Sequence, residues 1–91
     1  MTLNLSNQQL SNVPEDIFSH SSLEELWLDD NRIRELPDAI SQLTALKRLS
    51  IYKNQLTVFP KMLLQMANLE RINASQNKLD SIPAEIKNLA N

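Results

Sequence analysis

The stretch LEELWLDDNRIRELPDAISQLTA, residues 23–45, decides the fold because the chain repeats its pattern every 23 residues. The next stretch, LKRLSIYKNQLTVFPKMLLQMAN, residues 46–68, has leucine, asparagine and proline at matching positions. The same spacing relates all four prolines of the chain, which are Pro14, Pro37, Pro60 and Pro83. Units of such a repeat stack on one another because none can bury its apolar face alone. We therefore predict a single domain over residues 1–91, divided into repeats 1–22, 23–45, 46–68 and 69–91.

Each repeat is predicted to contain a short strand, a turn and one helical turn. In the second repeat Leu26 and Leu28 alternate with their neighbours, as a strand with one buried face requires. Proline fixes its own φ and holds the preceding residue extended, which suits an apolar side chain that turns inward. Ile40 and Leu43 then stand three positions apart, the spacing with which a helical turn buries one side. Stacked units of this kind give a curved solenoid with a parallel sheet on its concave side.

An asparagine follows each of the last three predicted strands. Its carboxamide both donates and accepts hydrogen bonds, so it can satisfy backbone groups in a turn that no strand partner reaches. We interpret this column as structural, and its members are Asn31, Asn54 and Asn77. In the first repeat Gln8 stands in the corresponding place.

The whole chain resembles the leucine-rich repeat, whose pattern is LxxLxLxxNxLxxLPxxIxxLxx. Its LPxxIxxL half is most similar to the intracellular Ras-group type of Ras-suppressor and scribble-like proteins, and some bacterial proteins use similar repeats. The resemblance implies an α/β solenoid, a right-handed arc with a short parallel sheet on the concave face and helical or 3-10 turns on the convex face. It also implies an interaction module or scaffold for a protein or peptide partner. The Ras-group type further suggests partners in small GTPase or kinase signalling.

Neither end of the predicted array has a dedicated cap with a polar outer face. The apolar residues that a neighbouring repeat would cover at the two ends are Leu3, Leu5, Ile86 and Leu89. Repeat arrays need polar capping units, and an unpaired strand edge is a template for association. Two interpretations follow: the chain is an excerpt of a longer repeat scaffold, or its copies assemble into a homo-oligomer through these ends.

The predicted concave face carries the chain's single tryptophan. Trp27 lies between Leu26 and Leu28, so alternation along the strand sends its side chain away from the core. Tyr52 follows one step further along the next strand, within diagonal reach. Aromatic residues with a polar group are enriched in interface hot spots, so we expect a partner to bind here. The predicted partner-binding residues are Glu25, Trp27, Asp29, Asp30, Arg48, Ser50, Tyr52, Lys53, Arg71 and Asn73. In the alternative interpretation Trp27 covers its own sheet and binds no partner.

Charges on this face change sign between repeats. The second repeat is acidic and the third and fourth are basic, through Glu24, Glu25, Asp29, Asp30, Lys47, Arg48, Lys53, Arg71 and Lys78. An acidic stripe beside a basic one would steer a partner of matching dipolar charge. Alternatively the charges neutralise each other, with Glu25 opposite Arg48 and Asp30 near Lys53. Exposed pairs of this kind contribute only about 0 to 1 kcal/mol to stability.

Composition argues against catalysis. The chain has no cysteine, no glycine and one histidine, His20, which we interpret as an edge residue of the first repeat. Without cysteine there is no thiolate nucleophile or thiolate metal ligand, and phosphate-cradling loops need glycine. We therefore predict no enzymatic activity, no cofactor and no metal site.

Composition also limits the kind of partner. A net charge of −2 argues against nucleic acid, whose backbone selects a basic surface. No apolar run approaches the roughly 20 residues of a membrane span. The opening residues MTLNLSNQQL lack the basic and apolar regions of a signal peptide. We expect a cytoplasmic protein that binds a protein or a peptide, with no membrane contact.

Overall fold

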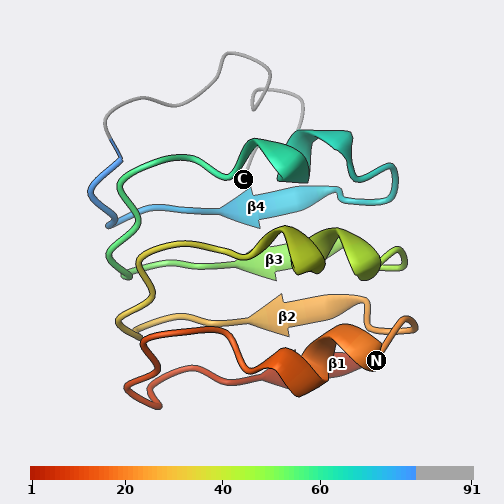
Figure 1. Ribbon diagram of the computed structural model, residues 1–91, viewed down its shortest axis with the longest axis horizontal. Helices are drawn as coiled ribbons and strands as arrows, with labels where there is room; N and C mark the ends of the chain where they lie inside the picture. Colours follow the sequence, from red (N-terminus) through yellow and green to blue (C-terminus); the bar gives the residue numbers. More distant parts are fainter. Residues whose placement is uncertain (80–91) are drawn as a thin grey trace.

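In the computed structural model, which describes residues 1–79, each repeat contributes one strand to a parallel sheet (Figure 1). The strands are β1 (Thr2–Asn4), β2 (Glu25–Trp27), β3 (Arg48–Ser50) and β4 (Arg71–Asn73). They lie in the sheet in chain order. Neighbouring strands pair without a shift, so one row across the sheet contains Leu3, Leu26, Leu49 and Ile72. A separation of 23 residues in the sequence thus becomes a sideways contact between strands.

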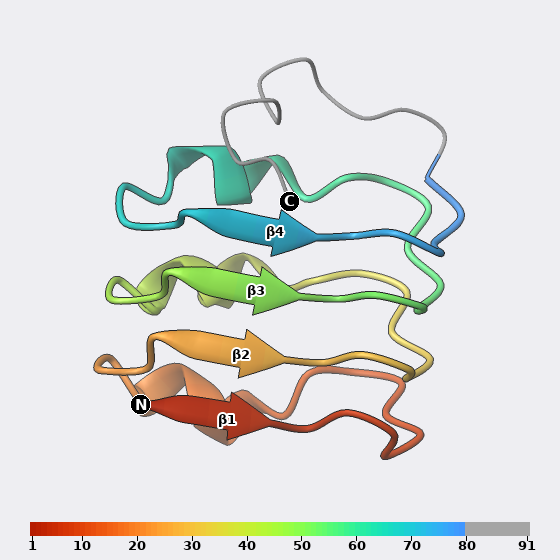
Figure 2. The same ribbon diagram turned by 180° about the vertical axis from the view of Figure 1, so that it is seen from behind.

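Short 3-10 helices form a second layer. They are η1 (Glu15–Ser19), η2 (Asp38–Gln42) and η3 (Lys61–Gln65). Figure 1 shows them in front of the sheet, and Figure 2 shows the sheet from the other side with the helices behind it. In the second repeat the N–H of Ile40 donates to the carbonyl of Pro37, and the N–H of Leu43 donates to the carbonyl of Ile40. Bonds of this spacing define a 3-10 turn, so the helical turn predicted after each proline is confirmed in the first three repeats.

The hydrophobic core lies between the sheet and the 3-10 helices. Its fully buried members come from equivalent positions of successive repeats: Leu23, Leu26, Leu28, Ile33, Ile40, Leu43, Leu46, Leu49, Ile51, Leu56 and Leu63. Both phenylalanines, Phe18 and Phe59, are also buried in it. The parallel sheet and the layer of 3-10 turns confirm the predicted solenoid.

The first repeat is less well covered than those that follow. Leu3 and Leu5 are only partly buried, whereas Leu26 and Leu28 at the equivalent positions are fully buried. Ile86 and Leu89, the residues predicted for association at the other end, lie outside the described residues. The association of copies through these ends stays a prediction.

The asparagine column connects each repeat to the one before it. Asn54 donates from Nδ2 to the carbonyl of Ile51 in its own repeat (3.1 Å) and to that of Leu28 in the preceding one (2.9 Å). Its Oδ1 accepts from the N–H of Ile33, again in the preceding repeat, at 3.1 Å. Asn31 and Asn77 make equivalent bonds. One carboxamide thus satisfies buried backbone groups of two repeats at once.

The turn after each strand places one residue in the left-handed region of backbone conformation. These residues recur with the period of the repeat and are Asn7, Asp30, Lys53 and Gln76, with φ between 58° and 60°. Gln9 of the first repeat is a further one, with φ 57°. Glycine enters this region freely, but the chain has none. For other residues the conformation costs about 1 to 2 kcal/mol, and less for asparagine and aspartate. The cost is therefore greatest at Lys53, Gln76 and Gln9.

We expect Asn54→Ala to lower the free energy of unfolding by about 1 to 3 kcal/mol. The reason is that the buried N–H of Ile33 and the carbonyl of Leu28 lose a hydrogen-bond partner. Urea unfolding of the purified variant measures the effect. Asn12→Ala is the matched control because Asn12 is exposed, and it should change the free energy by less than about 0.5 kcal/mol. Equal losses in the two variants would contradict the role of the column.

We expect Lys53→Gly to raise the free energy of unfolding by about 0.5 to 1 kcal/mol. Relief of the left-handed strain exceeds the entropy that glycine loses on folding, and the exposed pair with Asp30 contributes little. Lys61→Gly, at the start of η3, replaces the same side chain where φ is helical and should lower stability by a similar amount. Both values come from the same unfolding experiment. A loss in both variants would show that the turn at Lys53 is not strained.

Candidate functional site

The sheet face is the surface of β1 to β4 that lies opposite the core and the 3-10 helices (Figure 2). It carries Trp27, with 36% of its surface exposed, and Tyr52, with 38%. Among the described residues only Met1 and Val58 are other large apolar side chains with this much exposure. Leu26 and Leu28, on either side of Trp27, are buried. Alternation along β2 therefore places the tryptophan on the sheet face.

Trp27 and Tyr52 lie on neighbouring repeats, but Tyr52 is two residues further along its repeat than the residue that pairs with Trp27. In the register Trp27 stands between Asn4 of β1 and Ser50 of β3. Tyr52 follows Ser50 by two residues, and its backbone N–H donates to Oδ1 of Asp29 at 3.1 Å. That the two side chains lie within diagonal reach of each other stays a prediction.

Ser50 is buried, with only 5% of its surface exposed. In its row it stands between Trp27 and Asn73, and its hydroxyl donates to Oδ1 of Asp29. Neighbouring strands are only about 4.8 Å apart, so a small side chain is covered by larger side chains on the strands beside it. Ser50 lies on the sheet face, where alternation places it, but larger neighbours bury it. Alternation predicts which face a side chain is on and not how large its neighbours are.

Asp29 serves the sheet itself. Its Oδ1 accepts hydrogen bonds from the Ser50 hydroxyl and the Tyr52 backbone, and its own N–H donates to Oγ of Ser6 at 3.1 Å. The side chain is half-buried. These bonds tie the ends of β1, β2 and β3 together, so Asp29 shapes the surface on which a partner would bind.

The charges of the sheet face mostly occur in pairs. Nη1 of Arg48 lies 2.9 Å from Oε2 of Glu25, and Nζ of Lys53 lies 3.8 Å from Oδ1 of Asp30. In these two pairs the opposite charges neutralise each other, which was one of the two interpretations of the charge pattern. Arg71 stands directly opposite Arg48 in the register, and no residue among 1–79 forms an ion pair with it. Within the described residues Arg71 is therefore a positive charge without an ion-pair partner.

A hollow of about 190 Å³ opens on the sheet face across β2, β3 and β4. It is lined by Leu26, Trp27, Arg48, Leu49, Ser50, Arg71 and Asn73. The Oδ1 of Asn73 accepts from the N–H of Ser75 at 3.1 Å, which leaves its NH2 group without a partner among the described residues. The fold thus brings four of the predicted partner-binding residues together with Trp27, whereas Tyr52 does not line the hollow.

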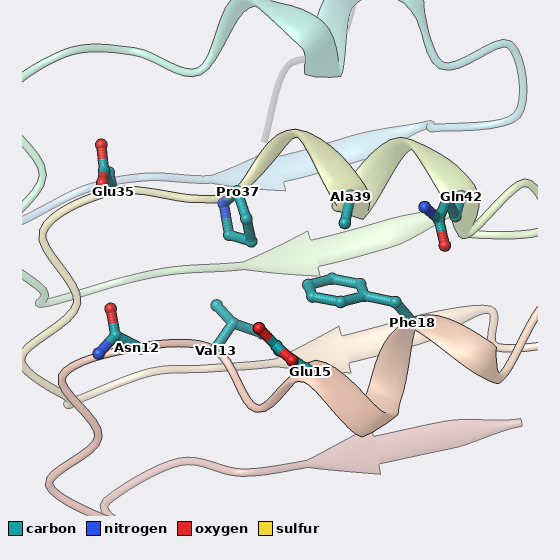
Figure 3. Close-up of a pocket in the computed structure, with 8 residues that line it drawn as sticks. All are labelled: Asn12, Val13, Glu15, Phe18, Glu35, Pro37, Ala39 and Gln42. Atoms are coloured by element: carbon teal, nitrogen blue, oxygen red, sulfur yellow. The ribbon is translucent and has the colours of Figure 1, made fainter.

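A second hollow, of about 540 Å³, lies between η1 and η2 and was not predicted. Figure 3 shows the ring of Phe18 lying between the two helices, with Pro37 and Ala39 across from it. The sequence signal for it is Phe18, because Ser41 stands at that position in the next repeat. Glu15 and Glu35 also line it, and neither forms an ion pair within residues 1–79.

The described part of the chain contains no group of three His, Asp or Glu side chains arranged to hold a metal ion. No helix among residues 1–79 has the length and the apolar character needed to cross a membrane.

Comparisons with known proteins agree with this architecture. The family model described as Leucine rich repeat matches residues 1–56 and again residues 21–79. A solved structure of a leucine-rich-repeat protein from Leptospira interrogans has a TM-score of 0.83 and 40% sequence identity. The match covers 96% of this chain and 22% of that protein, so the chain spans about a fifth of its length. A search of curated proteins found no match.

These matches extend over the repeats that build the sheet, the 3-10 layer and the core. The assignment to the Ras-group type rests on the sequence pattern alone and stays a prediction. The agreement of repeat pattern, family model and fold establishes the class: the chain belongs to the leucine-rich-repeat family.

Proposed function

We propose that the chain is an interaction module that binds a protein or peptide partner on the sheet face around Trp27 and Tyr52. The exposure of these two aromatic side chains on the surface opposite the core carries the proposal. Exposed aromatics with a polar group supply large contact area and a hydrogen bond, and such residues dominate binding energy at interfaces. Leucine-rich repeats generally mediate protein–protein interaction, which supports the same function.

The size of the sheet limits the partner. Four strands at a spacing of about 4.8 Å make a sheet only roughly 15 Å wide, and each strand has three residues. The area of this sheet is well below the roughly 800 Å² per partner of a standard interface. The described repeats alone would therefore bind a short peptide or bind a protein weakly. Additional repeats or additional copies would enlarge the surface without changing its chemistry.

We expect acrylamide to quench the fluorescence of Trp27 readily, with red-shifted emission, because over a third of the side chain is exposed. Trp27 is the single tryptophan, so the signal has one source. Blue emission with weak quenching would show that the face is already covered. Light scattering on the same sample then shows whether a second copy covers it.

We expect Trp27→Ala to weaken partner binding at least about 30-fold, the loss typical of an interface hot spot. Peptides selected from a random library on the wild-type chain supply the ligands, and their affinities are measured by calorimetry. Stability should change by less than about 1 kcal/mol, since the side chain lies outside the core.

Val58→Ala is the matched control for this variant, because Val58 is also large, apolar and exposed but lies outside the strands. It should leave the affinity of the selected peptides unchanged. Peptides that bind equally to the wild type and to Trp27→Ala would place the interaction on another surface and overturn the proposal.

A further inference from the structure

We propose that the hollow beside Trp27 binds a glutamate side chain of an acidic peptide segment, held by Arg48 and Arg71. The inference rests on the proposed function, since it names the partner chemistry of the same sheet face. Three features of the hollow carry it: its two arginines, of which only Arg48 has a carboxylate partner among the described residues, the direction of its hydrogen-bonding groups and its aromatic wall. The nearby carboxylate of Asp29 is already occupied as an acceptor by the Ser50 hydroxyl and the Tyr52 backbone.

The charge comes from the unshifted register. The first row of the strands runs Thr2, Glu25, Arg48 and Arg71. Thr2 and Arg48 both donate to the carboxylate of Glu25, at 3.2 Å and 2.9 Å. Glu25 therefore neutralises one arginine, and the row keeps one positive charge. Like charges directly opposite on neighbouring strands destabilise a sheet, so an anion between Arg48 and Arg71 would be favoured.

The polar groups of the hollow are mostly hydrogen-bond donors. Each guanidinium has five N–H groups, and Arg48 uses one nitrogen for Glu25. The NH2 group of Asn73 has no acceptor among the described residues, while its Oδ1 already accepts from Ser75. The Ser50 hydroxyl donates its only proton to Asp29. A ligand that accepts several bonds matches this lining, and a carboxylate offers two oxygens to a planar guanidinium.

The wall and the floor favour a carboxylate with an aliphatic stem. Trp27 borders the hollow, Ser50 lies buried beneath it, and the space of about 190 Å³ has the scale of one side chain. The methylene groups of glutamate can pack against the indole while the carboxylate reaches the arginines. Inorganic phosphate would satisfy the arginines but leave the indole without a contact.

The test uses the fluorescence of Trp27, which borders the hollow. The full chain is titrated separately with three ligands. They are a short capped peptide that alternates glutamate with alanine, the same peptide with glutamine in place of glutamate, and inorganic phosphate. Arg71→Gln should weaken binding of the glutamate peptide about tenfold, as the loss of a hydrogen bond to a charged group implies. Arg71→Lys should recover part of that loss, because it restores the charge without the planar fork.

Arg34→Gln is the matched control. Arg34 is also exposed and forms no ion pair within residues 1–79, but it lines a different hollow. It should bind the glutamate peptide with wild-type affinity. Equal losses in Arg34→Gln and Arg71→Gln would reduce the effect to overall charge and overturn the inference.

The remaining outcomes separate this inference from the proposed function. Equal binding of the glutamate and glutamine peptides would overturn the acidic ligand while leaving a binding surface at Trp27. Binding of phosphate but not of the glutamate peptide would also overturn it, because the hollow would then be a simple anion site. If library peptides bind in a Trp27-dependent way and the glutamate peptide does not, the inference fails and the proposed function stands.

Discussion

The buried carboxamide of the asparagine column is the interaction on which the stacking of the repeats depends. Asn54 accepts from the backbone of the preceding repeat and donates to carbonyls of both repeats, all within 3.1 Å for Ile33, Leu28 and Ile51. The carbonyls of Leu28 and Ile51 directly follow β2 and β3, and the N–H of Ile33 lies in the turn after β2. Because each carboxamide hydrogen-bonds to backbone groups of two repeats, it favours pairing of the neighbouring strands without a shift. The unshifted register of the sheet satisfies this constraint.

The level register in turn decides the charge of the sheet face. Side chains 23 positions apart become neighbours, so Glu25 meets Arg48 and Asp30 meets Lys53. Arg71 meets another arginine. The chain as a whole is acidic, yet the row of Glu25, Arg48 and Arg71 keeps a positive charge because of which residues share it. Charges more than about 8 Å away are largely screened at physiological ionic strength. A ligand bound on the sheet face would therefore respond more to the charges of the nearest row than to the net charge of the chain.

The period made the fold predictable from the sequence. Strand positions such as Leu26, the asparagines and the turn after each proline recur in residue type, and each type has a local physical reason. The left-handed turn residues were not predictable in this way, because Asn7, Asp30, Lys53 and Gln76 share no type and none is glycine. Tertiary constraint from the stacked turns imposes that conformation. The faces of Trp27 and Tyr52 followed from alternation, but the burial of Ser50 and the internal role of Asp29 depend on neighbours across the sheet. The register determines those neighbours, and residue type within one repeat does not.

For the proposed glutamate ligand, the step in side-chain size between Trp27 and Ser50 matters more than the area of the sheet. The hollow has the scale of one side chain, so its relief comes from the difference in size between adjacent side chains. A large indole beside a buried serine produces a hollow, and the arginines of the first row border it. Area alone does not determine affinity, because binding energy concentrates where an anchor is desolvated in a fitted pocket. In the proposed binding mode, discrimination between ligands would come from this one hollow, while the limited area of the sheet face would keep the overall affinity low.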